Sequence, residues 1–153
     1  MSVMRRNDYS IMNKICTTVE QSQRLMELGF DYNKADMCYD LGTGDAKASI
    51  NCENFTAYYT ADEYPEFKDR FIPAWSVGAL LDFLPPYLYE FERGIDLNIY
   101  RNLSGRGWHC SYMPNCIENL KEDKFRLITN GDDLLDAGYE MVLKLYEMKL
   151  LKL

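Results

Sequence analysis

The stretch from Asp132 to about Leu150 constrains the fold more than any other part of this chain. Its apolar residues recur at the spacing of one helix face, namely Leu135, Met141, Val142, Leu145 and Met148. Aspartates stand near its start and lysines near its end, as the helix dipole favours. Glu140 and Lys144 are spaced for an i,i+4 ion pair. We predict an amphipathic helix, with Gly138 in its apolar face allowing close approach to a hairpin.

Two alternating segments upstream supply that hairpin. Residues 95–99 and residues 108–112 each place apolar side chains at every second position, the period of a half-buried strand. A glycine-rich turn at 104–107 separates them, which indicates an antiparallel pair. Residues 125–129 could return as a third strand before the last helix.

Two earlier helices have clear boundary signals. Thr17 and Glu20 have the spacing of a capping box, and Gly29 fits the left-handed position after the end of that helix. A second helix starts at Ser76, with Trp75 and Leu80 spaced for a hydrophobic staple, and ends before the prolines at 85–86. Residues 37–41 read as a strand that residues 55–59 could pair with.

These elements predict an α+β fold. The hairpin, or a small antiparallel sheet, is covered by the C-terminal helix, and the two further helices pack around it. A length of 153 residues with 47% apolar residues favours one domain spanning residues 1–153. Residues 1–15 show no clear period, so they are interpreted as a tail or as a short segment that docks late.

The charge balance disfavours two classes of partner. The net charge is −7, from 17 Lys and Arg against 24 Asp and Glu, and no basic stripe is present. A phosphate backbone requires a basic face, so nucleic-acid binding is not expected, nor is binding to an anionic membrane. No stretch approaches the roughly 20 apolar residues of a membrane span. The five cysteines lack CxxC spacing, which fits reduced thiols in a cytoplasm.

No residue is assigned a catalytic, cofactor-binding or metal-binding role. His109 is the only histidine, and its neighbour Cys110 should point to the opposite face of the strand, toward the core. Gly42-Thr43-Gly44 lacks the remaining residues of a phosphate-binding motif and is interpreted as a plain turn. The acidic pair Asp132-Asp133 is explained by capping of the last helix, and the pair at 62–63 lies in a polar loop.

Tyrosine is unusually common, with twelve in the chain, and many aromatic residues fall in its middle. Core packing accounts for most of them. The others suit a contact surface, because tyrosine combines an apolar ring with a polar tip. The candidate interaction residues are Tyr58, Tyr59, Tyr64 and Tyr87.

Two resemblances accompany these patterns. The segments from Ile72 to Pro85 and from Asp136 to Leu145, with the helix end Leu28-Gly29-Phe30, resemble small uncharacterised proteins of phages and mobile elements in gut bacteria. That likeness implies a cytoplasmic accessory protein. The segments 112–116 and 131–137 resemble the strand, turn and helix start of HicB-type antitoxins, although Asn115 replaces the glycine of that turn and a long insertion separates the two pieces.

Three function hypotheses follow. The first is a non-enzymatic protein that binds another protein or itself, as a regulatory accessory of a phage or mobile element. The second is a binder that sequesters a small, nucleotide-like ligand, and the third is an enzyme of unknown type. A flat, exposed, tyrosine-rich patch would favour the first, and a pocket of converging polar groups beside aromatics would favour the second.

Overall fold

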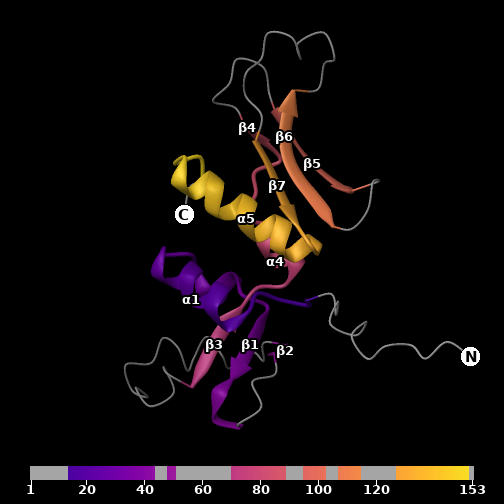
Figure 1. Cartoon of the computed structure of the whole chain (residues 1–153). Helices are drawn as coiled ribbons and strands as arrows, with labels where there is room; N and C mark the ends of the chain where they lie inside the picture. Colours follow the sequence, from indigo (N-terminus) through magenta and orange to yellow (C-terminus); the bar gives the residue numbers. More distant parts are fainter. Residues whose placement is uncertain are drawn as a thin grey trace, which may run out of the picture.

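The computed structural model describes residues 14–43, 48–50, 70–88, 95–102, 107–114 and 127–151, and it shows an α+β fold (Figure 1). The helices are α1 (Val19–Glu27), α4 (Val77–Leu81) and α5 (Leu134–Glu147), with short 3-10 turns η2 (Tyr32–Lys34) and η3 (Leu41–Thr43). The strands are β1 (Met37–Asp40), β2 (Ala48–Ile50), β3 (Phe71–Ala74), β4 (Tyr87–Leu88), β5 (Ile95–Arg101), β6 (Trp108–Pro114) and β7 (Leu127–Gly131).

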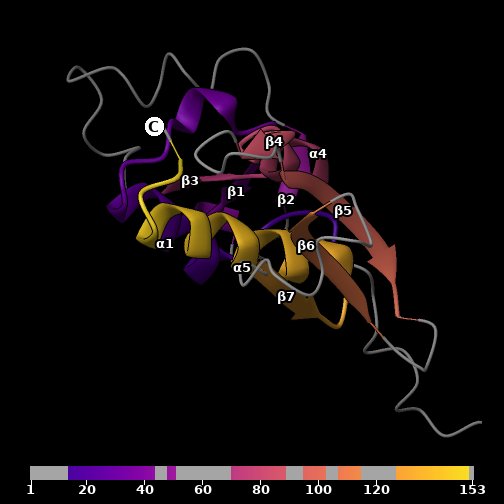
Figure 2. The ribbon, with the colours of Figure 1, turned by 90° about the horizontal axis from the view of Figure 1, so that it is seen from above.

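The predicted hairpin is confirmed as β5 and β6, which pair antiparallel from Ile95 opposite Pro114 to Arg101 opposite Trp108. It belongs to a four-stranded sheet in the order β4-β5-β6-β7. The suggested third strand is confirmed as β7, of which the structure describes Leu127–Gly131, whereas β4 was not anticipated. Helix α5 lies along β6 and β7 on one face of this sheet (Figure 2). The predicted cover of the sheet by the last helix is therefore confirmed.

Helix α5 is shorter at both ends than the predicted span. The Asp133 carboxylate accepts from Asp136 N–H at 2.8 Å and so caps the first turn. At the other end, Lys149 N–H donates to Tyr146 and Leu150 N–H donates to Leu145, which is a Schellman stop. Lys149 occupies the left-handed position of that motif, with φ of 59°.

The surroundings of Gly138 differ from those expected. Gly138 is buried in α5 as predicted, but a Cβ built on it would meet, among the described residues outside its own helix, only the Leu81 side chain of α4, at 3.6 Å. The expected close approach to the hairpin is therefore wrong at this residue. Helix α4 packs against α5 here instead.

This packing predicts opposite results for two substitutions of Gly138. Alanine should raise the free energy of unfolding by about 0.5–1 kcal/mol, because its Cβ fits at 3.6 Å from Leu81 and alanine is the better helix former. Leucine should lower it by about 1–3 kcal/mol through overpacking against α4. Urea denaturation of both variants would test this, and equal stabilities would mean that α4 moves aside freely.

The capping box of α1 is present, but one residue later than predicted. Thr18 is the N-cap and Gln21 completes the box, through bonds of 3.2 Å and 3.0 Å. Thr17 is fully buried instead, and its hydroxyl accepts from the backbone N–H of Trp75 at 3.0 Å. The predicted C-terminal stop is confirmed, because Gly29 has φ of 88° and Phe30 N–H donates to Leu25.

A second antiparallel sheet has the order β2-β1-β3. The strand predicted at 37–41 is confirmed as β1, but β3 was missed and contains Pro73, which an edge strand tolerates. The proposed partner at 55–59 lies outside the described residues. The end of β1 is held by an ion pair in which Arg70 donates to Asp40 at 2.6 Å and 2.8 Å.

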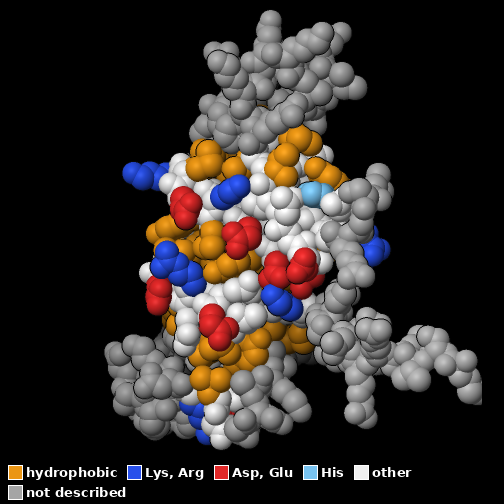
Figure 3. Space-filling model, viewed as in Figure 1, with side chains coloured by type: hydrophobic (Ala, Val, Ile, Leu, Met, Phe, Trp, Pro, Cys, Tyr) orange, Lys and Arg blue, Asp and Glu red, His pale blue; other side chains and the backbone are white. Residues whose placement is uncertain are grey.

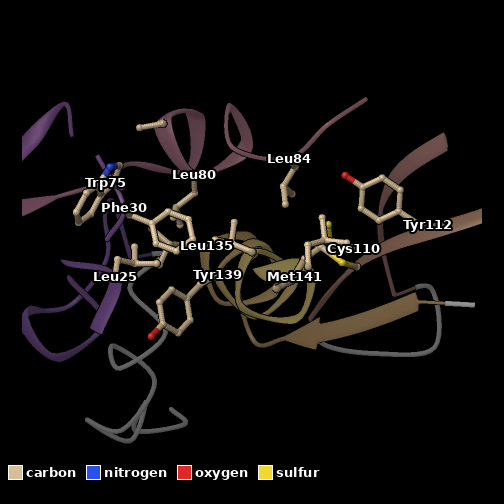
Figure 4. Packing of buried hydrophobic residues seen from close by; sticks show 14 of the residues in the cluster. Leu25, Phe30, Trp75, Leu80, Leu84, Cys110, Tyr112, Leu135, Tyr139 and Met141 are labelled. Carbon is tan, nitrogen blue, oxygen red and sulfur yellow. The ribbon is translucent and has the colours of Figure 1, made fainter. Parts of the chain in front are cut away.

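The four-stranded sheet and the three helices share one buried cluster (Figure 4). Trp75 and Leu80 are both fully buried, as the predicted staple before α4 requires. Phe30 stands edge-on to Phe83, with ring centroids 5.0 Å apart. The cluster continues along α5 to the sheet, where Tyr112 donates its hydroxyl to the Pro85 carbonyl at 2.5 Å. The second sheet adjoins this core at Trp75, the residue directly after β3.

Candidate functional site

A groove lies between β7 and the exposed side of α5. Its volume is about 770 Å³. The lining comes from the tip of the β5–β6 hairpin, from β7 and from α5: Asn102, Gly107, Trp108, His109, Ile128, Thr129, Asn130, Gly131, Asp132, Asp136, Glu140 and Lys144. Charged side chains gather over α5 on the face drawn in Figure 3. The groove is therefore mainly polar, with one strand as a wall.

Among the strands that the structure describes, β7 is the last of its sheet, so one of its edges has no described strand beside it. The hydrogen bond from Asn102 N–H to the Gly107 carbonyl fixes the alternation of bonds along the hairpin. It follows that the backbone groups of Thr129 point toward β6, whereas those of Ile128 and Asn130 point out to the open edge. Among the described residues, the only bond to these outward groups is from Lys144 Nζ to the Ile128 carbonyl, at 3.1 Å.

The helix side of the groove presents Asp136, Glu140 and Lys144, which are spaced four residues apart and lie on one face of α5. The predicted ion pair between Glu140 and Lys144 is not formed. Lys144 bonds to Ile128 instead, because its side chain reaches the strand edge beside it. Within the described part of the chain, the carboxylates of Glu140 and Asp132 therefore receive no hydrogen bond or ion pair.

Lys14 neutralises the third carboxylate of the groove. Its ammonium lies 2.8 Å from both oxygens of Asp136, and Gln21 donates to the same carboxylate at 3.0 Å. The hydrogen bond to Asp136 raises the pKa of Lys14, and the nearby charge of Asp132 acts in the same direction. The ion pair therefore stabilises the fold fully at pH values below the ordinary lysine pKa. This stabilisation is lost as the pH rises through the raised pKa of Lys14. The rim of the groove already holds one lysine.

His109 closes the hairpin end of the groove. Its ring stacks on Tyr100, with centroids 5.0 Å apart, and its Nδ1 is buried without a partner among the described residues. Cys110 points to the opposite face and is fully buried, as predicted. Burial raises the pKa of the Cys110 thiol to about 12. A thiol of this kind is a packing group, since nucleophilic attack requires the thiolate.

The predicted tyrosine surface is only partly visible. Tyr58, Tyr59 and Tyr64 lie outside the described residues. Tyr87 is 46% exposed, in β4 at the opposite edge of the sheet from β7. It does not line the groove.

The other residues considered from sequence occupy structural positions. Cys16 and Cys38 are buried free thiols, and residues 52, 62, 63 and 116 are not described. At the predicted turn, Gly42 N–H donates to Asp40 at 2.9 Å, so this amide is used within the turn. Asp133 caps α5 as expected, whereas its neighbour Asp132 lines the groove.

This groove was not predicted from the sequence. Its helix side could have been found from the polar residues Asp136, Glu140 and Lys144, which repeat every four residues opposite the apolar stripe. Its strand side has no local signal, because the position of β7 at the sheet edge depends on the whole topology.

Comparison of the chain with protein-family models, with curated proteins and with solved structures finds no match. The resemblances to phage or mobile-element proteins and to HicB-type antitoxins therefore stay hypotheses. As for membranes, none of the helices that the structure describes is long and apolar enough to cross a bilayer.

Proposed function

We propose that this chain is a non-enzymatic protein-binding module, and that an extended polypeptide segment of another protein binds in the groove as an additional strand beside β7. The observation that carries the proposal is the open edge of β7, where Ile128 and Asn130 direct backbone groups into the groove. Strand addition uses these groups for affinity and uses the side chains around them for specificity. With the resemblance to accessory proteins of phages and mobile elements, this favours a regulatory role.

The lining of the groove supports a peptide better than a nucleotide-like ligand. A small-ligand site would show polar groups that converge beside aromatic residues. The stacked rings of His109 and Tyr100 at the end of the groove meet part of this description. Three carboxylates and one lysine line it, however, and that lysine is bonded to Ile128. A phosphate would need cationic or amide donors that converge on it. Small-ligand sites are also mostly apolar, unlike this one.

A proline at Asn130 gives a direct test, because it removes an N–H that points into the groove and is not used by β6. Short random peptides from a display library would first be selected for binding to the full chain. We expect selected peptides to bind Asn130→Pro about tenfold more weakly, the effect of one lost hydrogen bond and a blocked edge. Asn130→Ala keeps the N–H and should bind within about threefold of the original chain.

Folding of the proline variant is checked by circular dichroism and thermal melting. A second measurement does not depend on that variant: amide exchange at Ile128 and Asn130, followed by NMR, should slow when a selected peptide is added. Absence of any selected peptide, or equal binding by Asn130→Pro with unaltered exchange at both amides, would contradict the proposed function.

A further inference from the structure

The charge of the groove identifies the chemistry of its occupant. We infer that the bound segment carries a lysine or arginine whose cationic group pairs with one of the two groove carboxylates that Lys14 does not neutralise, Asp132 or Glu140. This inference rests on the proposed function and adds a specificity to it. The contacts of the three groove carboxylates carry the argument.

Two of these carboxylates are available to a ligand. Asp132 and Glu140 are exposed and line the groove, and no described residue donates a hydrogen bond to either of them. Asp136, one helix turn before Glu140, is already paired with Lys14. The groove thus has three carboxylates against Lys144 within it and Lys14 at its rim, which leaves an excess of negative charge.

The contact between Lys14 and Asp136 shows how a carboxylate of the groove binds a cation. The Lys14 ammonium approaches both oxygens of Asp136 at 2.8 Å, although this lysine comes from a segment remote in sequence from α5. The raised pKa of Lys14 agrees with a local field that favours positive charge. Asp132 and Glu140 stand four residues before and after Asp136, so a second cation placed beside Lys14 would meet the carboxylate of one or the other.

Strand addition would bring such a cation to the correct side. Alternate side chains of a strand point to opposite faces of the sheet. Helix α5 covers one face next to β7, so every second side chain of an added strand would project toward the stripe of Asp136 and Glu140. The side chains between them would lie on the face of His109. A single basic position, spaced within an otherwise uncharged segment, is the expected pattern.

The same peptide selection tests this specificity when it is repeated on Asp132→Asn/Glu140→Gln. The matched control is Asp82→Asn/Glu147→Gln, which changes the net charge equally at two exposed residues that do not line the groove. We expect one basic position among peptides selected on the original chain and on the control, and none on the groove variant. Replacing that residue by glutamine should weaken binding about twofold to fivefold at low salt, as for one exposed ion pair. The difference should shrink as salt is added.

The possible outcomes distinguish failure of this inference from failure of the proposed function. Selected peptides without a basic position, or a basic position that persists on the groove variant, would overturn the inference and leave strand addition in place. Failure to select any peptide would overturn both. Binding that appears only after Arg5→Glu/Arg6→Glu would also overturn the inference, because it would assign the groove to the chain's own N-terminal segment.

Discussion

Replacement of Trp75 by alanine is expected to lower the free energy of unfolding by about 3–5 kcal/mol. Trp75 is the largest of the fully buried side chains among the described residues, and it lies in the buried cluster, directly after β3. In Figure 4 its ring lies near Leu25 and Phe30, from α1 and the turn that ends it, and near Leu80 of α4. Alanine would leave a cavity among elements that cannot all close inward together.

Phenylalanine is the control at this position, with an expected loss of about 1–2 kcal/mol. It retains most of the ring, and it removes Trp75 Nε1, a buried donor with no partner among the described residues. The backbone bonds between Trp75 and Thr17 stay available to both variants. Urea denaturation should be followed by circular dichroism, since Trp75 is one of only two tryptophans. A loss below about 1 kcal/mol for alanine would show that the core collapses around the site.

Local patterns were sufficient for the helices and for the hairpin. The apolar stripe and capping residues of α5, and the alternation in β5 and β6, each act over a few residues, and the structure confirms them. The cap of α1 shows where such patterns become ambiguous. Thr17 and Thr18 both precede a suitable third residue, and Thr18 is the cap because Thr17 is buried against Trp75. A tertiary contact therefore decides between two equivalent local signals.

The short strands could not be predicted in the same way. Strand β3 contains Pro73 and has only four residues, and β4 has two residues directly after a pair of prolines. Their strand conformation comes from pairing with β1 and β5, not from a period of their own. Proline within a run argues against a strand, except at a sheet edge, and the edges are known only from the assembled topology.

The groove combines both kinds of information. The polar repeat on α5 is visible in the sequence, but its significance depends on β7 lying beside it with an open edge. The sequence also suggested that Glu140 would be neutralised by Lys144. Because Lys144 bonds to Ile128, Glu140 remains available, and the specificity inferred for the groove depends on that difference.

Replacement of Gly131 by alanine is expected to cost about 3 kcal/mol or more, at the upper end of overpacking effects. Gly131 ends β7, and a Cβ on it would collide with the backbone nitrogen of Ala137 and lie 2.8 Å from the Asp133 carbonyl. Its φ is not in the left-handed region, so alanine is excluded by contact and not by backbone conformation. Backbone atoms cannot rotate away, so the first turn of α5 would have to move.

Gly138→Ala is the comparison for this effect, because it makes the same change within α5, at a position where the new Cβ has room. Urea denaturation should therefore give shifts of opposite sign for the two variants. Gly131 also lines the groove, and the collision involves the turn that carries Asp136. Gly131→Ala should consequently weaken binding of selected peptides even at temperatures where the variant is folded. Equal stability of the two alanine variants would show that the β7–α5 connection adapts, and that the groove is less rigid than strand addition requires.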